Sequence, residues 1–133
     1  MREAENYLIA IVDDDKSVRE ATTSLLKSNG FRAETFSSAQ EFLDSPLVAK
    51  TRCLLLDIAM PGMNGLELQR RLASEGRRIP IIFITARDNP EIRTEAMRAG
   101  AVDFLPKPFS EEALLKAIRN TLKTLPYDEG TIP

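Results

Sequence analysis

Carboxylate side chains stand directly after apolar runs at two places in this sequence. The triplet Asp13-Asp14-Asp15 follows the apolar run at residues 7–12, and Asp57 follows a second apolar run. A run of this kind, bounded by turn residues, is typical of a strand that is buried on both faces. In an open parallel sheet, ligands bind at the carboxyl edge of the strands. The sequence therefore predicts that these acids meet at a binding site.

Thr85 and Lys107 occupy the corresponding place in two later segments. Thr85 ends an apolar run, and Lys107 follows a short run and stands between two prolines. Lys107 offers a point positive charge that suits an oxyanion, and Thr85 offers a hydroxyl donor. Three carboxylates in one pocket repel one another and raise the pKa of at least one of them unless a cation joins them.

This donor set favours a hard metal ion. The sequence has no histidine, and its one cysteine lies within an apolar run, so carboxylates are the available ligands. Oxygen ligands of this kind favour Mg²⁺, with Mn²⁺ as an alternative. A carboxylate nucleophile, a divalent cation, a lysine and a hydroxyl are together the parts of a phosphoryl-transfer site. We therefore expect phosphoryl-transfer chemistry at this edge of the sheet.

The elements that position these groups follow from the apolar periodicity, which predicts five strands alternating with five helices. The predicted strands are residues 7–12, 31–36, 53–57, 80–85 and 101–105, and the predicted helices are residues 18–29, 38–44, 65–75, 89–100 and 110–125. Strict alternation favours an α/β fold, a doubly wound five-stranded parallel sheet with helices on both faces. In the strand order 2-1-3-4-5, the first and third strands are neighbours, which brings Asp13, Asp14 and Asp57 into one pocket.

Composition excludes several other classes of protein. The chain has 133 residues, enough for one domain, and a formal net charge of -2, which gives no basic field for nucleic acid. The absence of histidine excludes Ser-His and Cys-His catalysis. Cys53 alone cannot form an internal disulfide, no stretch is long enough to span a bilayer, and residues 1–6 do not resemble a signal peptide. We therefore expect a cytoplasmic protein that contacts neither membrane nor nucleic acid directly.

Four segments resemble the motifs of the receiver domain of two-component response regulators, and most closely those of its FixJ-type branch. They are residues 11–15 (IVDDD), 56–65 (LDIAMPGMNG), 84–86 (ITA) and 96–109 (AMRAGAVDFLPKPF). The resemblance covers residues 7–125 and implies a flavodoxin-like, CheY-like fold. It leaves residues 1–6 as an N-terminal extension and residues 126–133 as a tail or the start of a linker.

The resemblance implies a role for each acid and for the lysine. Asp57 is expected to accept a phosphoryl group from a sensor histidine kinase. Asp14 is expected to bind Mg²⁺ directly, Asp13 mainly through water, and Ala59 through its backbone carbonyl. Lys107 is expected to pair with the phosphoryl oxygens, and its peptide bond to the following proline is expected to be cis. The protein would then be a phosphoacceptor that phosphorylates and dephosphorylates itself, without being an enzyme for other substrates.

The resemblance also implies a switch. Thr85 is expected to move toward the phosphoryl group, and Phe104 is expected to turn inward as Thr85 leaves its space. The readout is a population shift on the surface of the fourth helix, the fifth strand and the fifth helix. The expected output is transcription through a DNA-binding domain outside this chain, with homodimerisation on phosphorylation as a further hypothesis. A stand-alone receiver is the alternative.

Simpler interpretations exist for the same residues. Asp15 is expected to cap the first helix, and one cap suffices, so it leaves the other two acids of the triplet for the pocket. Phe104 is a core residue in any case. A pseudo-receiver that works without phosphate would have a defective pocket, whereas every expected pocket residue is present. A phosphatase of the haloacid dehalogenase type resembles a pattern with a second Asp two residues after the nucleophile, where this chain has Ala59.

Overall fold

The predicted strands form one parallel sheet. The computed structural model describes residues 7–86 and 89–123, and within them the sheet has five strands in the order β2-β1-β3-β4-β5. The strands are β1 (Leu8–Val12), β2 (Arg32–Phe36), β3 (Thr51–Asp57), β4 (Ile81–Thr85) and β5 (Asp103–Pro106). The predicted fold class and strand order are thereby confirmed.

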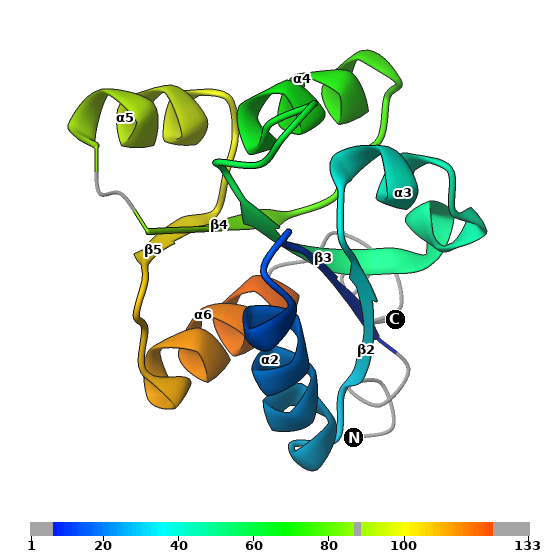
Figure 1. Ribbon diagram of the computed structural model, residues 1–133, viewed down its shortest axis with the longest axis vertical. Coiled ribbons are helices and arrows are strands. Elements are labelled where there is room, and N and C mark those ends of the chain that lie inside the picture. The colour runs from blue at the N-terminus through cyan, green and yellow to red at the C-terminus, as the bar shows by residue number, and fades with distance from the viewer. Residues whose placement is uncertain (1–6, 87–88, 124–133) are drawn as a thin grey trace, which may run out of the picture.

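Helices cover both faces of this sheet. They are α2 (Lys16–Ser28), α3 (Ala39–Leu43), α4 (Gly65–Ser74), α5 (Pro90–Arg98) and α6 (Glu111–Lys123), with a 3₁₀ helix η1 at Pro46–Lys50. Helices α3, α4 and α5 lie on one face, and α2 and α6 lie on the other (Figure 1). This arrangement leaves the carboxyl edge of the strands open between the two layers of helices.

Strand burial explains the apolar runs in the sequence. Every residue of β1 and of β4 is buried, because these strands lie inside the sheet with helices on both sides. In the edge strand β2, Arg32 and Glu34 are exposed, whereas Ala33 and Phe36 are buried. Each face of the sheet has its own apolar cluster, so the sheet holds the carboxyl ends of its strands in a fixed array.

Several element boundaries differ from the predicted ones. Strand β3 begins at Thr51, two residues early, and the 3₁₀ helix before it was not expected. Strand β5 begins at Asp103 because the preceding residues close α5: the Ala101 amide donates to the Ala96 carbonyl. The predicted extension at residues 1–6, the tail at residues 126–133 and the last turn of the final helix lie outside the described residues. Among the described residues, no helix has both the length and the apolar character needed to cross a membrane.

Candidate functional site

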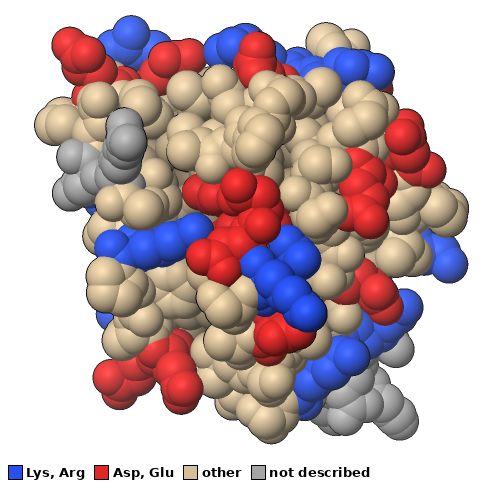
Figure 2. Space-filling model, viewed as in Figure 1, with Lys and Arg blue, Asp and Glu red and all other residues tan. Residues whose placement is uncertain are grey.

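Three carboxylates converge at the carboxyl edge of the sheet, where Asp13 follows β1 and Asp57 ends the neighbouring β3. One ligand oxygen from each of Asp13, Asp14 and Asp57 lies within 4.8 Å of the others. Asp13 is fully buried and Asp57 is 5% exposed, whereas Asp14 is exposed. Acidic side chains gather in the middle of this face, with basic ones on either side (Figure 2). The predicted convergence of the three acids is confirmed.

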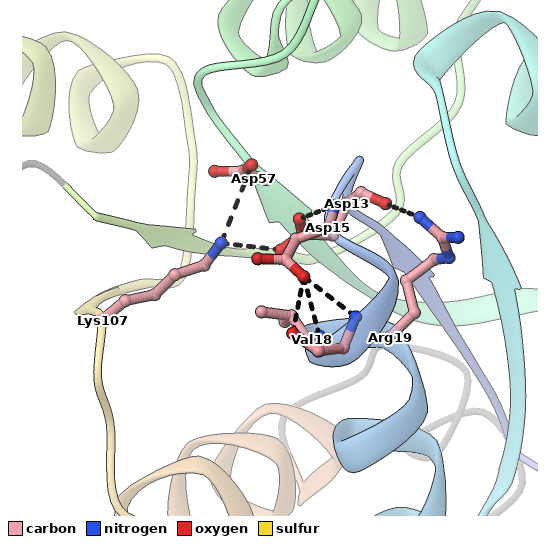
Figure 3. A network of polar contacts seen from close by, with 7 residues as sticks. Asp13, Asp15, Val18, Arg19, Asp57 and Lys107 are labelled. Atoms are coloured by element: carbon pink, nitrogen blue, oxygen red, sulfur yellow. Dashed lines mark hydrogen bonds and ion pairs between the residues drawn. The ribbon is translucent and has the colours of Figure 1, made fainter.

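Asp13 is held at every polar atom. Its backbone amide donates to the Phe36 carbonyl (3.1 Å), and its Oδ1 accepts a hydrogen bond from the Asp15 amide (2.9 Å). Its Oδ2 accepts from Lys107 Nζ (2.8 Å), and its carbonyl accepts from Arg19 Nη1 (2.7 Å; Figure 3). Sequence analysis missed Arg19, because its contact depends on how α2 leaves the sheet. Asp13 is therefore a fixed part of the site.

Asp15 turns away from the pocket and caps α2. Its Oδ1 accepts hydrogen bonds from the Ser17 amide (2.9 Å), the Ser17 hydroxyl (2.7 Å) and the Val18 amide (3.3 Å; Figure 3). The Ser17 hydroxyl, followed by the two amides, lowers the pKa of Asp15, because these donors favour the ionised carboxylate. As predicted, the triplet divides into one capping residue and two residues at the pocket.

Lys107 reaches the acids from the segment after β5. Its Nζ lies 2.8 Å from Asp13 Oδ2 and 3.8 Å from Asp57 Oδ2 (Figure 3). The Lys107 amide donates to the Thr85 carbonyl, 2.6 Å away, which ties this segment to the end of β4. The peptide bond between Lys107 and Pro108 is cis, as the resemblance implied. The lysine therefore bridges two carboxylates from two different strands.

The surroundings of Asp57 oppose its ionisation. Burial is the largest cause and the nearby charge of Asp13 is the second, and both raise the pKa of Asp57. Lys107 lowers this pKa, and Asp14 raises it by a smaller amount. The resulting pKa of Asp57 is about 7. Without a further cation, this carboxyl therefore holds its proton to a much higher pH than an exposed aspartate does.

The loop after Asp57 folds back against its backbone. A Cβ atom at Gly65 would lie 2.5 Å from the Asp57 carbonyl oxygen and 2.9 Å from the Ile58 Cα, which is closer than real Cβ atoms approach. The Gly65 amide donates to the Ile58 carbonyl (2.9 Å), and Asn64 forms a capping box at the start of α4. Ala59 is exposed in this loop. Gly65, predicted only as the first residue of a helix, therefore also sets how closely α4 approaches Asp57.

Thr85 and Phe104 are both buried on the two strands that lie beyond β3 in the sheet. Thr85 ends β4 and is 3% exposed, and Phe104 on β5 is 2% exposed. The Phe104 ring lies 6.3 Å from the Phe83 ring, centroid to centroid. The guanidinium carbon of Arg93 lies over the Phe104 ring, 5.2 Å from its centroid. The aromatic side chain thus occupies the inward position in this structure.

The site as a whole suits a hard divalent cation. The donor set consists of carboxylates on two adjacent strand ends, without nitrogen or sulfur ligands. Two of these carboxylates are buried, and Lys107 supplies one positive charge to both of them. A divalent cation would compensate the remaining negative charge, which fits the raised pKa of Asp57.

The fold and this site define a class of signalling domain, and the comparison with known families agrees. Residues 9–119 match the response regulator receiver domain. The chain therefore belongs to the response regulator receiver family, and the resemblance found in its motifs is confirmed.

Individual relatives narrow this assignment. The chain is 48% identical over 126 residues to the response regulator protein TmoT of Ectopseudomonas mendocina, covering 95% of the chain and 57% of TmoT. It is 37% identical over 118 residues to the transcriptional regulatory protein FixJ of Azorhizobium caulinodans, covering 89% of the chain and 56% of FixJ. The chain thus spans little more than half the length of these curated relatives.

Solved structures show the same fold. The response regulator StyR is 48% identical to the chain, with a TM-score of 0.83, over 89% of the chain and 60% of the StyR chain. The structure of FixJ-N is 38% identical, with a TM-score of 0.80, over 90% of the chain and 95% of that structure. Receiver-sized structures are therefore matched almost completely, whereas longer regulators are matched in part.

Proposed function

We propose that this chain is a phosphorylation-operated receiver in which Asp57 accepts a phosphoryl group from a sensor histidine kinase. The observation that carries the proposal is the convergence of Asp13, Asp14 and Asp57, with Lys107 bridging two of them. Receiver domains of response regulators interact with sensor histidine kinases, and this chain belongs to that family. The proposed domain spans residues 7–125.

The proposed metal site consists of Asp13, Asp14, Asp57 and the backbone carbonyl of Ala59. Mg²⁺ suits this oxygen set, and Mn²⁺ is the expected substitute. A bound divalent ion supplies positive charge that compensates the carboxylates and the oxygens of an incoming phosphoryl group. Asp13 is held at its amide, its carbonyl and both carboxylate oxygens, so its position is set before a ligand arrives.

The proposed transfer exchanges one bond to phosphorus for another. An Asp57 carboxylate oxygen forms a bond to phosphorus, while the bond between phosphorus and the kinase histidine breaks and its electron pair stays on the imidazole. Lys107 Nζ, 3.8 Å from Asp57, neutralises charge on the phosphoryl oxygens. Attack by water on the acyl phosphate then releases inorganic phosphate and restores the carboxylate. The same chemistry allows self-phosphorylation from small phosphodonors and slow autodephosphorylation.

A groove beside the acceptor suits the kinase. On the α2 side, the groove is lined by Ser17, Val18, Ala21, Thr22 and Leu25. On the side of the segment after β5, it is lined by Lys107, Pro108, Phe109 and Glu111. The apolar side chains of this groove suit the apolar face of an amphipathic helix. Lys107 also lines the groove and lies 3.8 Å from Asp57, so the groove reaches the carboxylates. A kinase helix that carries the donor histidine would therefore dock here.

The proposed response uses two buried side chains, Thr85 at the end of β4 and Phe104 on β5. Thr85 moves so that its hydroxyl hydrogen-bonds the phosphoryl group. Phe104 occupies its buried position when Thr85 has moved. The readout is the surface of α5, β5 and α6, with homodimerisation on phosphorylation. Relatives that bear the name transcriptional regulatory protein support transcription as the output, carried by a region outside the receiver.

Intact-protein mass spectrometry after incubation with acetyl phosphate and Mg²⁺ tests the proposal. We expect one added phosphoryl group on the wild type and none on Asp57→Asn, with Asp44→Asn as an exposed carboxylate control that still gains the group. Because hydrolysis can remove the adduct, the same variants are titrated with beryllofluoride and followed by amide NMR at Thr85 and Phe104. A wild type that shows neither an adduct nor these shifts contradicts the proposal.

A further inference from the structure

Phe104 depends for its burial on residues outside its own strand. Strand β5 lies at the edge of the sheet, with β4 as its neighbour. Phe104 is the fully buried residue of β5, while Asp103, Leu105 and Pro106 are partly or fully exposed. The Phe83 ring on β4 contacts it at a tilted angle of 44°. The contact on the remaining surface of the Phe104 ring therefore decides whether this side chain stays buried.

Arg93 lies over that surface from α5. Its guanidinium carbon is 5.2 Å from the centroid of the Phe104 ring, within the range of a cation–π interaction. Arg93 is an exposed residue on the first half of α5, and its guanidinium covers one side of the ring. This contact joins two elements, α5 and β5, that belong to the proposed output surface.

Helix α5 is anchored on its other side to α4. The buried Gln69 donates from Nε2 to the Ala96 carbonyl at 3.0 Å, and Arg70 Nη1 pairs with Glu95 Oε2 at 3.1 Å. The helix therefore has a fixed support against which Arg93 can hold a ring on the neighbouring strand. A movement of α5 away from β5 would remove the guanidinium from Phe104.

We propose that Arg93 is a positioning residue that holds the Phe104 ring in its buried position and couples that ring to α5. The consequence for signalling rests on the proposed function, in which the buried ring accompanies the phosphorylated state. The coupling itself is independent of phosphorylation, because it follows from the contact between the guanidinium and the ring. Most exposed arginines interact mainly with water; this one lies over the ring of a residue that is 2% exposed.

Ring accessibility in the protein without a phosphoryl mimic tests the coupling directly. Phenylalanine labelled with ¹³C in the ring is incorporated, and the Phe104 signal is assigned with Phe104→Leu. Relaxation by a dissolved gadolinium chelate then reports how exposed the ring is. We expect a larger effect on Phe104 in Arg93→Met, which keeps the length of the side chain and removes its charge, and partial rescue in Arg93→Lys. Arg98→Met, on the exposed last turn of α5, is the matched control and should match the wild type.

Beryllofluoride affinity in the presence of Mg²⁺ tests the link to signalling. We expect Arg93→Met to weaken binding about two- to fivefold, the fold-change that matches an exposed cation–π interaction. In the Phe104→Leu background the same substitution should have a smaller effect, because the contact with the Phe104 ring is already gone. An equal loss in both backgrounds, or a Phe104 ring no more accessible in Arg93→Met than in the wild type, overturns the proposal. A wild type that does not bind beryllofluoride contradicts the proposed function instead, and ring accessibility still decides the role of Arg93.

Discussion

Lys107 forms its shorter ion pair with Asp13, at 2.8 Å, although the two residues are 94 positions apart in the chain. Asp13 is fully buried, so this lysine is the main source of positive charge for a carboxylate that water does not reach. A lysine in this position serves the folded structure before any phosphoryl group arrives. Under the proposed function, its amine would shift from Asp13 toward a phosphoryl group on Asp57.

Removal of this lysine should therefore lower stability. We expect Lys107→Met to reduce the free energy of unfolding by about 3 kcal/mol in EDTA, because Asp13 is left as an unpaired buried charge. Added Mg²⁺ should restore part of the loss, because it supplies charge to the same carboxylate. Urea unfolding followed by circular dichroism measures both values. A loss of the same size with and without Mg²⁺ would contradict this role.

Asp57 should make the stability of the metal-free protein dependent on pH. Its pKa is about 7 in the folded state, well above the ordinary value of 3.8 for an exposed carboxyl. The neutral form is favoured by folding, so its contribution is fully present below about pH 4 and is lost as the pH rises through 7. Asp57→Asn lacks this ionisation. The melting temperature of Asp57→Asn minus that of the wild type should therefore increase from pH 5 to pH 8. A difference that stays constant over this range would contradict the raised pKa of Asp57.

The same carboxyl should make metal binding dependent on pH. A cation and a proton compete for Asp57, so the apparent affinity for Mg²⁺ should rise about tenfold per pH unit below 7 and level off above it. Isothermal titration calorimetry at pH 6, 7 and 8 measures this slope. Asp57→Asn should bind Mg²⁺ more weakly and without the slope. A slope that persists in Asp57→Asn would place the competing proton on another group.

Gly65 should be intolerant of a methyl group. Alanine at the start of a helix is ordinarily favourable, by up to about 1 kcal/mol. Here its Cβ would lie 2.5 Å from the Asp57 carbonyl oxygen, so we expect Gly65→Ala to lower the free energy of unfolding by about 1–3 kcal/mol. It should also weaken beryllofluoride binding, because Asp57 is displaced. Ser74→Ala, at the other end of α4, should leave binding unchanged.

Substitutions of Asp14 and of Asp15 should have separate effects, one on metal binding and the other on helix capping. Asp15→Ala removes the cap of α2 and should lower the free energy of unfolding, with Mg²⁺ affinity retained. Asp14→Ala should lose Mg²⁺ affinity and keep the helix cap. Chemical unfolding and Mg²⁺ titration of both variants measure the two effects. Loss of metal binding in Asp15→Ala would show that this division of the triplet is wrong.

The fold and the location of the site follow from local patterns in the sequence. The apolar runs before Asp13, Asp57 and Thr85 define buried parallel strands, and the order of the strands places their ends together. The helix cap at Asp15 was also visible, because a cap depends on residues a few positions away. Patterns of this kind need no knowledge of tertiary contacts.

Other features depend on contacts that no local pattern encodes. The approach of Gly65 to Asp57, the hydrogen bond from Arg19 to the Asp13 carbonyl, and the position of Arg93 over Phe104 each depend on how a helix packs against the sheet. A glycine before a helix or an arginine on an exposed face has the same local signature whether or not such a contact exists.

The distance along the chain between the parts of the site has a consequence for protein synthesis. Asp13 is made early and Lys107 late, and the parts meet only when five strands have assembled. Because a domain of this kind folds as a unit, a copy in which Lys107 has not yet been made has the carboxylates but no complete site. Under the proposed function, copies that lack this last part of the site would not accept phosphoryl groups from the kinase.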